Sequence, residues 1–222
     1  MDDETIFLNR SDAGKRLAEK LLDFGGSDAL VLAIPRGGVP VGFEVAQRLS
    51  AELDVIVPRK IPIPWNPEAG LGAVTADGTT VVNEPLAREL GLTDDEVNAE
   101  AEEVRQEVAR RTERYRRGDR PFPRIGVRPV ILVDDGLASG YTMLAAIDSL
   151  KRYGPHSIVV AVPVASAGAA RLVSPHVDRL VVLTVSSQLP FAVADFYAEW
   201  RDLTDEEVVS CLDRAAGLRR AA

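Results

Sequence analysis

Short apolar runs alternate along this chain with stretches in which apolar residues recur at helical spacing. The runs predict buried strands at 29–34, 54–58, 129–133, 157–162 and 179–185. Helical spacing predicts helices at 11–24, 39–49, 94–117, 140–153 and 165–172, and in the tail. This alternation predicts an α/β fold with a mainly parallel sheet and helices on both faces.

The middle of the chain departs from that alternation. Residues 59–70 are proline-rich and have no regular period, so they are expected to form a loop. Two extended pieces at 71–75 and 79–83 flank an Asp77-Gly78 turn, which predicts a small hairpin. We expect one domain over 1–222, with a hood contributed by the N-terminal helix, the C-terminal tail or both.

Composition narrows the class of protein. The 222 residues are 46% hydrophobic and 27% charged, with a net charge of −8, which argues against broad nucleic-acid binding. The longest apolar stretch, 158–165, is too short to cross a membrane. With one cysteine, Cys211, and no pattern of a signal peptide, a soluble cytoplasmic protein is expected.

The segment 130–142 combines features that suit a sugar phosphate. A hydrophobic strand delivers two carboxylates, Asp134 and Asp135, and a loop of small and hydroxyl residues then enters a helix. Backbone N–H groups at the start of a helix can surround a phosphate dianion, and Gly140 lets the anion approach closely. The two acids would repel that phosphate, so they suit neutral sugar hydroxyls or the shell of a Mg²⁺ ion. Together these groups describe a site for ribose 5-phosphate.

Two other interpretations of this segment remain open. Asp134 and Asp135 can simply cap the next helix, with a plain turn between strand and helix. A generic nucleotide-binding α/β domain is the second, and it predicts that replacing both acids by asparagine leaves sugar-phosphate affinity unchanged.

The same segment closely resembles the binding motif of the type I phosphoribosyltransferases. The resemblance implies that Asp134 and Asp135 hold the ribose 2- and 3-hydroxyls of phosphoribosyl pyrophosphate. It implies that the 5-phosphate is held by Ala138, Ser139, Gly140, Tyr141 and Thr142. Ser139 stands where threonine is more frequent, and Tyr141 is bulky where many members have a small residue. Ala138 replaces the aspartate usual in members that use 6-oxopurines, so hypoxanthine and guanine are not favoured as acceptors.

Two further segments fit the resemblance. Arg36, Gly37 and Gly38 look like the pyrophosphate-binding loop, and a strained or cis peptide near Arg36-Gly37 would suit that role. A tight turn that uses glycine only for its geometry is the alternative. Arg59 and Lys60 are similar to the basic, catalytic pair before the mobile loop of orotate-type members.

The resemblance implies an enzyme of the pentosyltransferase class of glycosyltransferases. It would transfer a 5-phosphoribosyl group from phosphoribosyl pyrophosphate to a nucleobase-like nitrogen acceptor and release pyrophosphate. Mg²⁺ would be bound mainly through the ligand, with Asp134 and Asp135 acting through water. The alternative function is a non-catalytic regulator that senses phosphoribosyl pyrophosphate or a nucleotide. A homodimer is compatible with either, and no nucleic-acid or membrane partner is expected.

Overall fold

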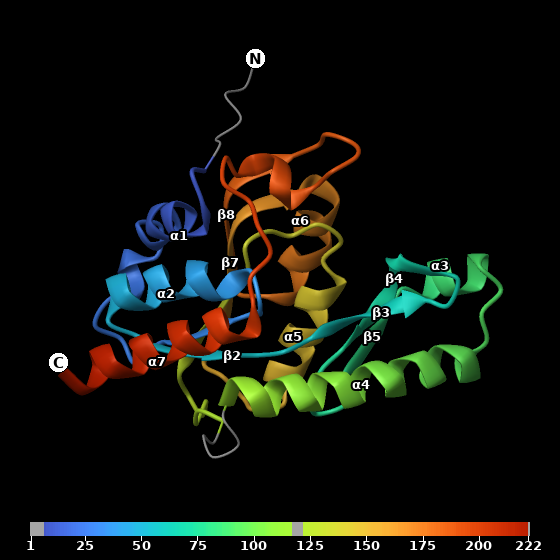
Figure 1. Ribbon diagram of the computed structural model, residues 1–222, viewed down its shortest axis with the longest axis horizontal. Coiled ribbons are helices and arrows are strands. Elements are labelled where there is room, and N and C mark those ends of the chain that lie inside the picture. The colour runs from blue at the N-terminus through green and yellow to red at the C-terminus, as the bar shows by residue number, and fades with distance from the viewer. Residues whose placement is uncertain (1–6, 117–121, 222) are drawn as a thin grey trace.

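The computed structural model describes residues 7–116 and 122–221, and the protein is built on a five-stranded sheet (Figure 1). The strand order is β2-β1-β6-β7-β8, and every neighbouring pair is parallel. The strands are β1 (Leu30–Ala33), β2 (Glu52–Val55), β6 (Pro129–Val133), β7 (Ser157–Ser166) and β8 (Arg179–Ser186). Each overlaps a predicted apolar run, although β2 begins and ends earlier than the run predicted at 54–58, and the parallel sheet is confirmed.

Helices cover both faces of this sheet. One face carries α1 (Arg10–Ala18), α2 (Gly38–Leu49) and α7 (Asp205–Ala221), and the other carries α5 (Tyr141–Lys151) and α6 (Ala167–Val173) (Figure 1). Each face of the sheet packs against its helices in a separate hydrophobic core. Successive strand residues alternate between the two cores: Val31 and Ala33 pack toward α2, and Leu30 and Leu32 pack toward α5. The predicted fold class is therefore confirmed.

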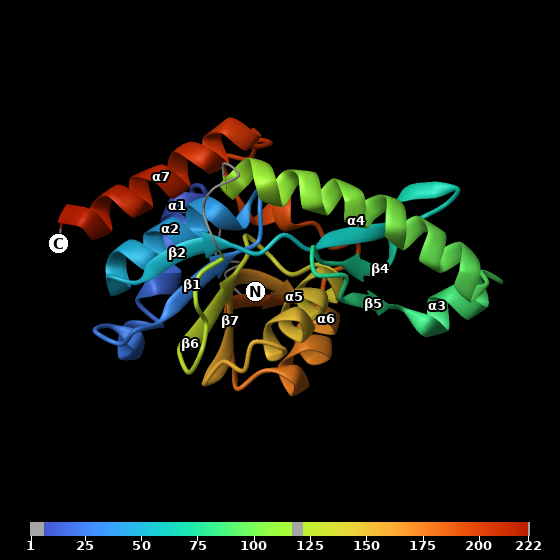
Figure 2. The same ribbon diagram turned by 90° about the horizontal axis from the view of Figure 1, so that it is seen from below.

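Residues 59–116 form a separate arm beside the central sheet, which both views show extending to one side (Figures 1 and 2). Its three antiparallel strands have the order β3-β4-β5. The arm consists of β3 (Arg59–Ile63), β4 (Asn66–Val74), β5 (Thr80–Val82), α3 (Glu84–Glu89) and α4 (Asp94–Arg116). The predicted hairpin around Asp77-Gly78 is confirmed, with Val74 opposite Thr80.

The loop predicted over 59–70 is wrong, because these residues form β3 and the start of β4. Proline is tolerated because β3 is an edge strand, and the register shifts next to Pro62. Burial of Ile61 and Leu71 in a core shared with Val104 of α4 stabilises the pair of strands. Tertiary packing thus overrides the local composition.

The start of the described chain pairs with the segment that precedes α7. Phe7 lies opposite Tyr197, and both rings pack in a small cluster with Phe196. Helix α1 is shorter than predicted and is capped by Asn9, whose side chain accepts from the Asp12 N–H at 3.1 Å. Short 3₁₀ helices lie at Leu22–Phe24, Ser174–His176 and Val193–Phe196. Across the described ranges no helix has the length and apolar character needed to span a bilayer.

Candidate functional site

The loops that follow β1 and β6 lie in direct contact at the carboxyl edge of the sheet. A Cβ on Gly37 would stand 1.8 Å from Oδ2 of Asp135, and one on Gly38 would stand 2.9 Å from Cα of Asp134. Only glycine permits this approach. The peptide bond between Pro35 and Arg36 is cis, one bond before the position at which the sequence suggested it. The loop with Arg36 and the two acids therefore belong to one site.

The two acids are held in different ways. Arg10 Nε donates to Oδ2 of Asp135 at 2.8 Å, and the Tyr197 hydroxyl donates to the Asp135 carbonyl oxygen at 2.6 Å. Asp134 Oδ1 accepts from the Asp135 N–H at 2.8 Å. Burial raises the pKa of both carboxyls, and the charge of Asp135 raises the pKa of Asp134 further, whereas Arg10 lowers both. This pair of carboxylates is set for a ligand that stabilises their ionised forms.

Keeping the Asp134 carboxylate ionised next to Asp135 destabilises the fold at neutral pH. We therefore predict that Asp134→Asn is more stable to heat than the wild type at this pH. A carboxyl whose folded pKa is raised stabilises the fold below its ordinary pKa and loses that contribution as pH rises through the folded pKa. Asparagine retains the oxygen that accepts from Asp135 and carries no charge. We expect a rise in Tm of about 2–4 °C at pH 7, which corresponds to roughly 1 kcal/mol for a chain of this size, and little difference near pH 4. Calorimetric scans from pH 4 to 8 measure it, and a variant less stable at pH 7 would contradict this explanation.

The predicted phosphate loop joins the acids to α5. Gly140 is the N-cap of α5 with φ +88°, a backbone conformation that favours glycine. The loop is anchored on β7: Leu137 N–H donates to the Val164 oxygen at 2.9 Å, and Ser166 Oγ donates to the Ala138 oxygen at 2.7 Å.

The backbone N–H groups of the loop are not used by the fold. No N–H from Ala138 to Thr142 donates a hydrogen bond to any residue that the structure describes, and Ala138 and Ser139 are exposed. A row of unused donors at the positive end of a helix is the arrangement that binds an anion. That these residues hold a phosphate stays a prediction.

The predicted catalytic pair lies at the junction of the arm and the central sheet. Arg59 Nη1 contacts Glu107 Oε1 at 2.8 Å. Burial and the nearby charge of Arg111 lower the pKa of Arg59, Glu107 opposes them, and Arg36 lowers it further. Arg59 therefore lies within electrostatic reach of the loop after β1. Both residues of the pair line a groove of about 670 Å³ between β3 and α4, together with the acidic side chains of Glu100 and Glu103.

Arg10 is a site residue that sequence reasoning missed. Besides its ion pair with Asp135, it donates to the Arg201 carbonyl oxygen at 2.9 Å and lies 3.8 Å from the centre of the Trp200 ring. Only 8% of its surface is exposed. In the sequence it is one of many arginines, and no local pattern distinguishes it.

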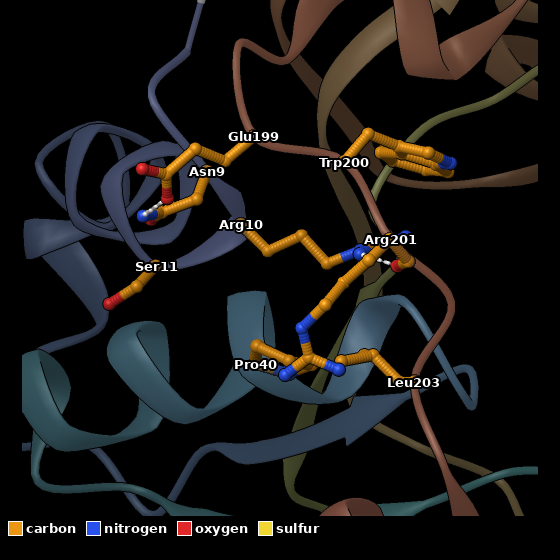
Figure 3. Close-up of a pocket in the computed structure, with 8 residues that line it drawn as sticks. All are labelled: Asn9, Arg10, Ser11, Pro40, Glu199, Trp200, Arg201 and Leu203. Atoms are coloured by element: carbon orange, nitrogen blue, oxygen red, sulfur yellow. Dashed lines mark hydrogen bonds between the residues drawn. The ribbon is translucent and has the colours of Figure 1, made fainter.

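A pocket of about 500 Å³ opens beside Arg10, between α1, the start of α2 and the tail (Figure 3). Its lining residues are Asn9, Arg10, Ser11, Pro40, Glu199, Trp200, Arg201 and Leu203. The tail aromatics therefore differ in role: Phe196 and Tyr197 belong to the core, and Trp200 lines this pocket.

The fold and the site together define an α/β protein whose candidate ligand groups gather at the carboxyl ends of a parallel sheet. A family model described as "Phosphoribosyl transferase domain" matches residues 74–200. The chain belongs to this phosphoribosyl transferase domain family.

Individual relatives agree with this assignment. Two Mycobacterium tuberculosis proteins, named "Putative phosphoribosyl transferase MT0597" and "Putative phosphoribosyl transferase Rv0571c", are each 40% identical over 210 residues. That match covers 95% of this chain and 47% of each relative, so the chain spans about half the length of these curated relatives. The crystal structure of TT1426 from Thermus thermophilus is similar with a TM-score of 0.77 and 41% identity, covering 93% of this chain and 97% of that one.

Proposed function

We propose that this chain transfers the 5-phosphoribosyl group of phosphoribosyl pyrophosphate to a nitrogen acceptor and releases pyrophosphate. One observation carries the proposal: unused loop amides, two partly buried acids and the Gly37-Gly38 turn adjoin one another along a single edge of the sheet. In that order they match a 5-phosphate, the ribose hydroxyls and the diphosphate on C1. The match to the phosphoribosyl transferase domain family supports the same assignment.

The chain's residues would act mainly by positioning and by charge. The amides of 138–142 fix the 5-phosphate, and the carboxylates of Asp134 and Asp135 accept from the 2- and 3-hydroxyls, so that C1 has one orientation. The Gly37 amide, Arg36 and Arg59 stabilise the charge that develops on the departing pyrophosphate, whereas the Gly38 amide donates to the Ile34 carbonyl oxygen at 3.0 Å. The N–C1 bond to the acceptor forms as the C1–O bond breaks through a transition state resembling an oxocarbenium ion. Pyrophosphate leaves with the electron pair of the C1–O bond, and the proton on the acceptor nitrogen passes to solvent.

The residues present fit a Mg²⁺ ion that is bound mainly through the ligand. Asp134 and Asp135 offer hard oxygen ligands. Because the pKa of each carboxyl is raised, a cation nearby would stabilise the ionised carboxylates. No cluster of three or more acidic, histidine or cysteine side chains suited to a metal occurs among the described residues. When bound, Mg²⁺ supplies charge neutralisation to the diphosphate.

The hood over the acceptor is proposed to come from α1 and the tail of the same domain. The pocket beside Arg10 is lined by both segments, and Arg10 itself contacts Asp135 (Figure 3). An acceptor in this pocket would therefore approach the sugar from the side of the acids.

Turnover with a panel of nitrogen bases tests the function. Pyrophosphate release from phosphoribosyl pyrophosphate and Mg²⁺ is expected to depend on adding one of the bases, with hypoxanthine and guanine poor acceptors because Ala138 has no carboxylate for the purine. The matched control omits the acceptor and reports hydrolysis alone. Tight binding of phosphoribosyl pyrophosphate with no release for any base would contradict the enzyme proposal and favour the non-catalytic sensor.

A further inference from the structure

The last turns of helix α4 bring one face of the arm back to the central sheet. Glu107, Arg111 and Tyr115 are spaced four residues apart and so lie on one face of the helix. Figure 2 shows this end of α4 reaching α7. Arg59 Nη1 and Arg111 Nε contact the same oxygen, Oε1 of Glu107, at 2.8 and 3.4 Å. The Tyr115 hydroxyl donates to Oδ1 of Asp205, at the start of α7, at 2.7 Å.

The same junction includes the loop after β1. Oδ1 of Asp205 lies 3.9 Å from Arg36 Nη1, and its Oδ2 lies 3.0 Å from Arg114 Nη1. Glu107 and Asp205, together with Glu206 on Arg114, thus pair with four guanidinium groups that come from three segments of the chain. Arg111 and Arg36 both lower the pKa of Arg59, which shows that these like charges repel one another. Such a cluster in a protein with a net charge of −8 is suited to an anionic ligand.

We propose that Arg111 is a further diphosphate-binding residue, which acts with Arg36 and Arg59 of the same chain. The inference rests on the proposed function and extends the site into the arm. Arg36 directly precedes the glycine that touches Asp135, so it lies where a diphosphate on C1 would leave the sugar. The side chains of Arg36, Arg59 and Arg111 are 36%, 36% and 28% exposed, which leaves them accessible.

Glu107 has a definite part in this arrangement. Its carboxylate pairs with Arg59 and Arg111 in the absence of ligand and would compete with a diphosphate for both. Helix α4 is then held against the site by the anion as well as by its buried apolar face. The arm thereby contributes to ligand affinity without contacting the sugar.

Comparing two ligands isolates the role of Arg111. Phosphoribosyl pyrophosphate carries the diphosphate and ribose 5-phosphate lacks it, so a diphosphate residue affects the binding of the first ligand alone. We expect Arg111→Gln to lower the affinity for phosphoribosyl pyrophosphate by about 10- to 100-fold, the usual effect of losing a charge-assisted hydrogen bond. The affinity for ribose 5-phosphate should stay unchanged. Arg111→Lys should recover part of the loss. Arg105→Gln is the matched control, since Arg105 is exposed on the same helix and pairs with Glu102.

A second variant has the opposite expected effect. Glu107→Gln removes the competing carboxylate and should tighten phosphoribosyl pyrophosphate binding by about two- to fivefold, the range for one exposed ion pair. Three results would overturn the role of Arg111. They are unchanged affinity for phosphoribosyl pyrophosphate in Arg111→Gln, equal losses of affinity for both ligands in that variant, and weaker binding of phosphoribosyl pyrophosphate in Glu107→Gln. If the wild type binds neither ligand, the proposed function itself fails.

Discussion

The double variant Asp134→Asn/Asp135→Asn is expected to lose at least 100-fold in affinity for phosphoribosyl pyrophosphate. Each carboxylate would accept a hydrogen bond from a sugar hydroxyl, and a hydrogen bond to a charged group contributes about 1.5–3 kcal/mol. Two such losses together amount to roughly 100-fold or more, since each 1.4 kcal/mol is a factor of ten. Calorimetric titration with and without Mg²⁺ measures the loss.

The control for this variant is an aspartate nearby that takes no part in the site. Asp148 lies on α5 and pairs with Lys151 at 3.1 Å, so Asp148→Asn should bind like the wild type. Equal affinity of the double variant and the wild type would favour the interpretation in which the acids only cap a helix or belong to a generic nucleotide-binding domain.

Gly37→Ala is the second substitution with a large expected effect. The added Cβ would lie 1.8 Å from Oδ2 of Asp135, well inside van der Waals contact, so the carboxylate or the loop must move. A displacement of about 1 Å in a positioned group can cost on the order of 100-fold in rate. We therefore expect kcat/KM for pyrophosphate release to fall by about that factor while the circular dichroism spectrum stays native.

Gly168→Ala provides the matched control for that substitution. Gly168 lies in α6, and a Cβ there would meet only Ser166 Oγ, at 3.9 Å. The control should therefore keep wild-type activity. If Gly37→Ala were as active as Gly168→Ala, the contact between the two loops would have no part in catalysis.

The central sheet could be predicted because its strands are buried on both faces. Runs such as 130–133 are apolar at every position, and the loops that leave them carry the polar residues of the site. The contact between the glycine loop and the acids follows from parallel topology, since carboxyl ends of parallel strands share one edge. The motif at 134–142 is contiguous in sequence and could be recognised directly.

The arm could not be predicted in the same way. The prolines of 59–70 indicated a loop, whereas β3 is stabilised by packing of Ile61 against residues of α4 more than forty positions away. Arg10 has the same difficulty, because it gains its place in the site from the carboxylate of Asp135, which only the fold brings near. Helical spacing does predict the pair of Arg111 with Glu107, but it does not predict that Arg59 contacts the same carboxylate.

A crystal structure with ribose 5-phosphate bound would show whether the loop and the two acids form one sugar-phosphate site. In that structure the phosphate oxygens should accept from the N–H groups of 138–142, and the 2- and 3-hydroxyls should donate to the carboxylates of Asp134 and Asp135. A phosphate bound elsewhere, or a sugar that leaves both carboxylates without contact, would contradict this prediction.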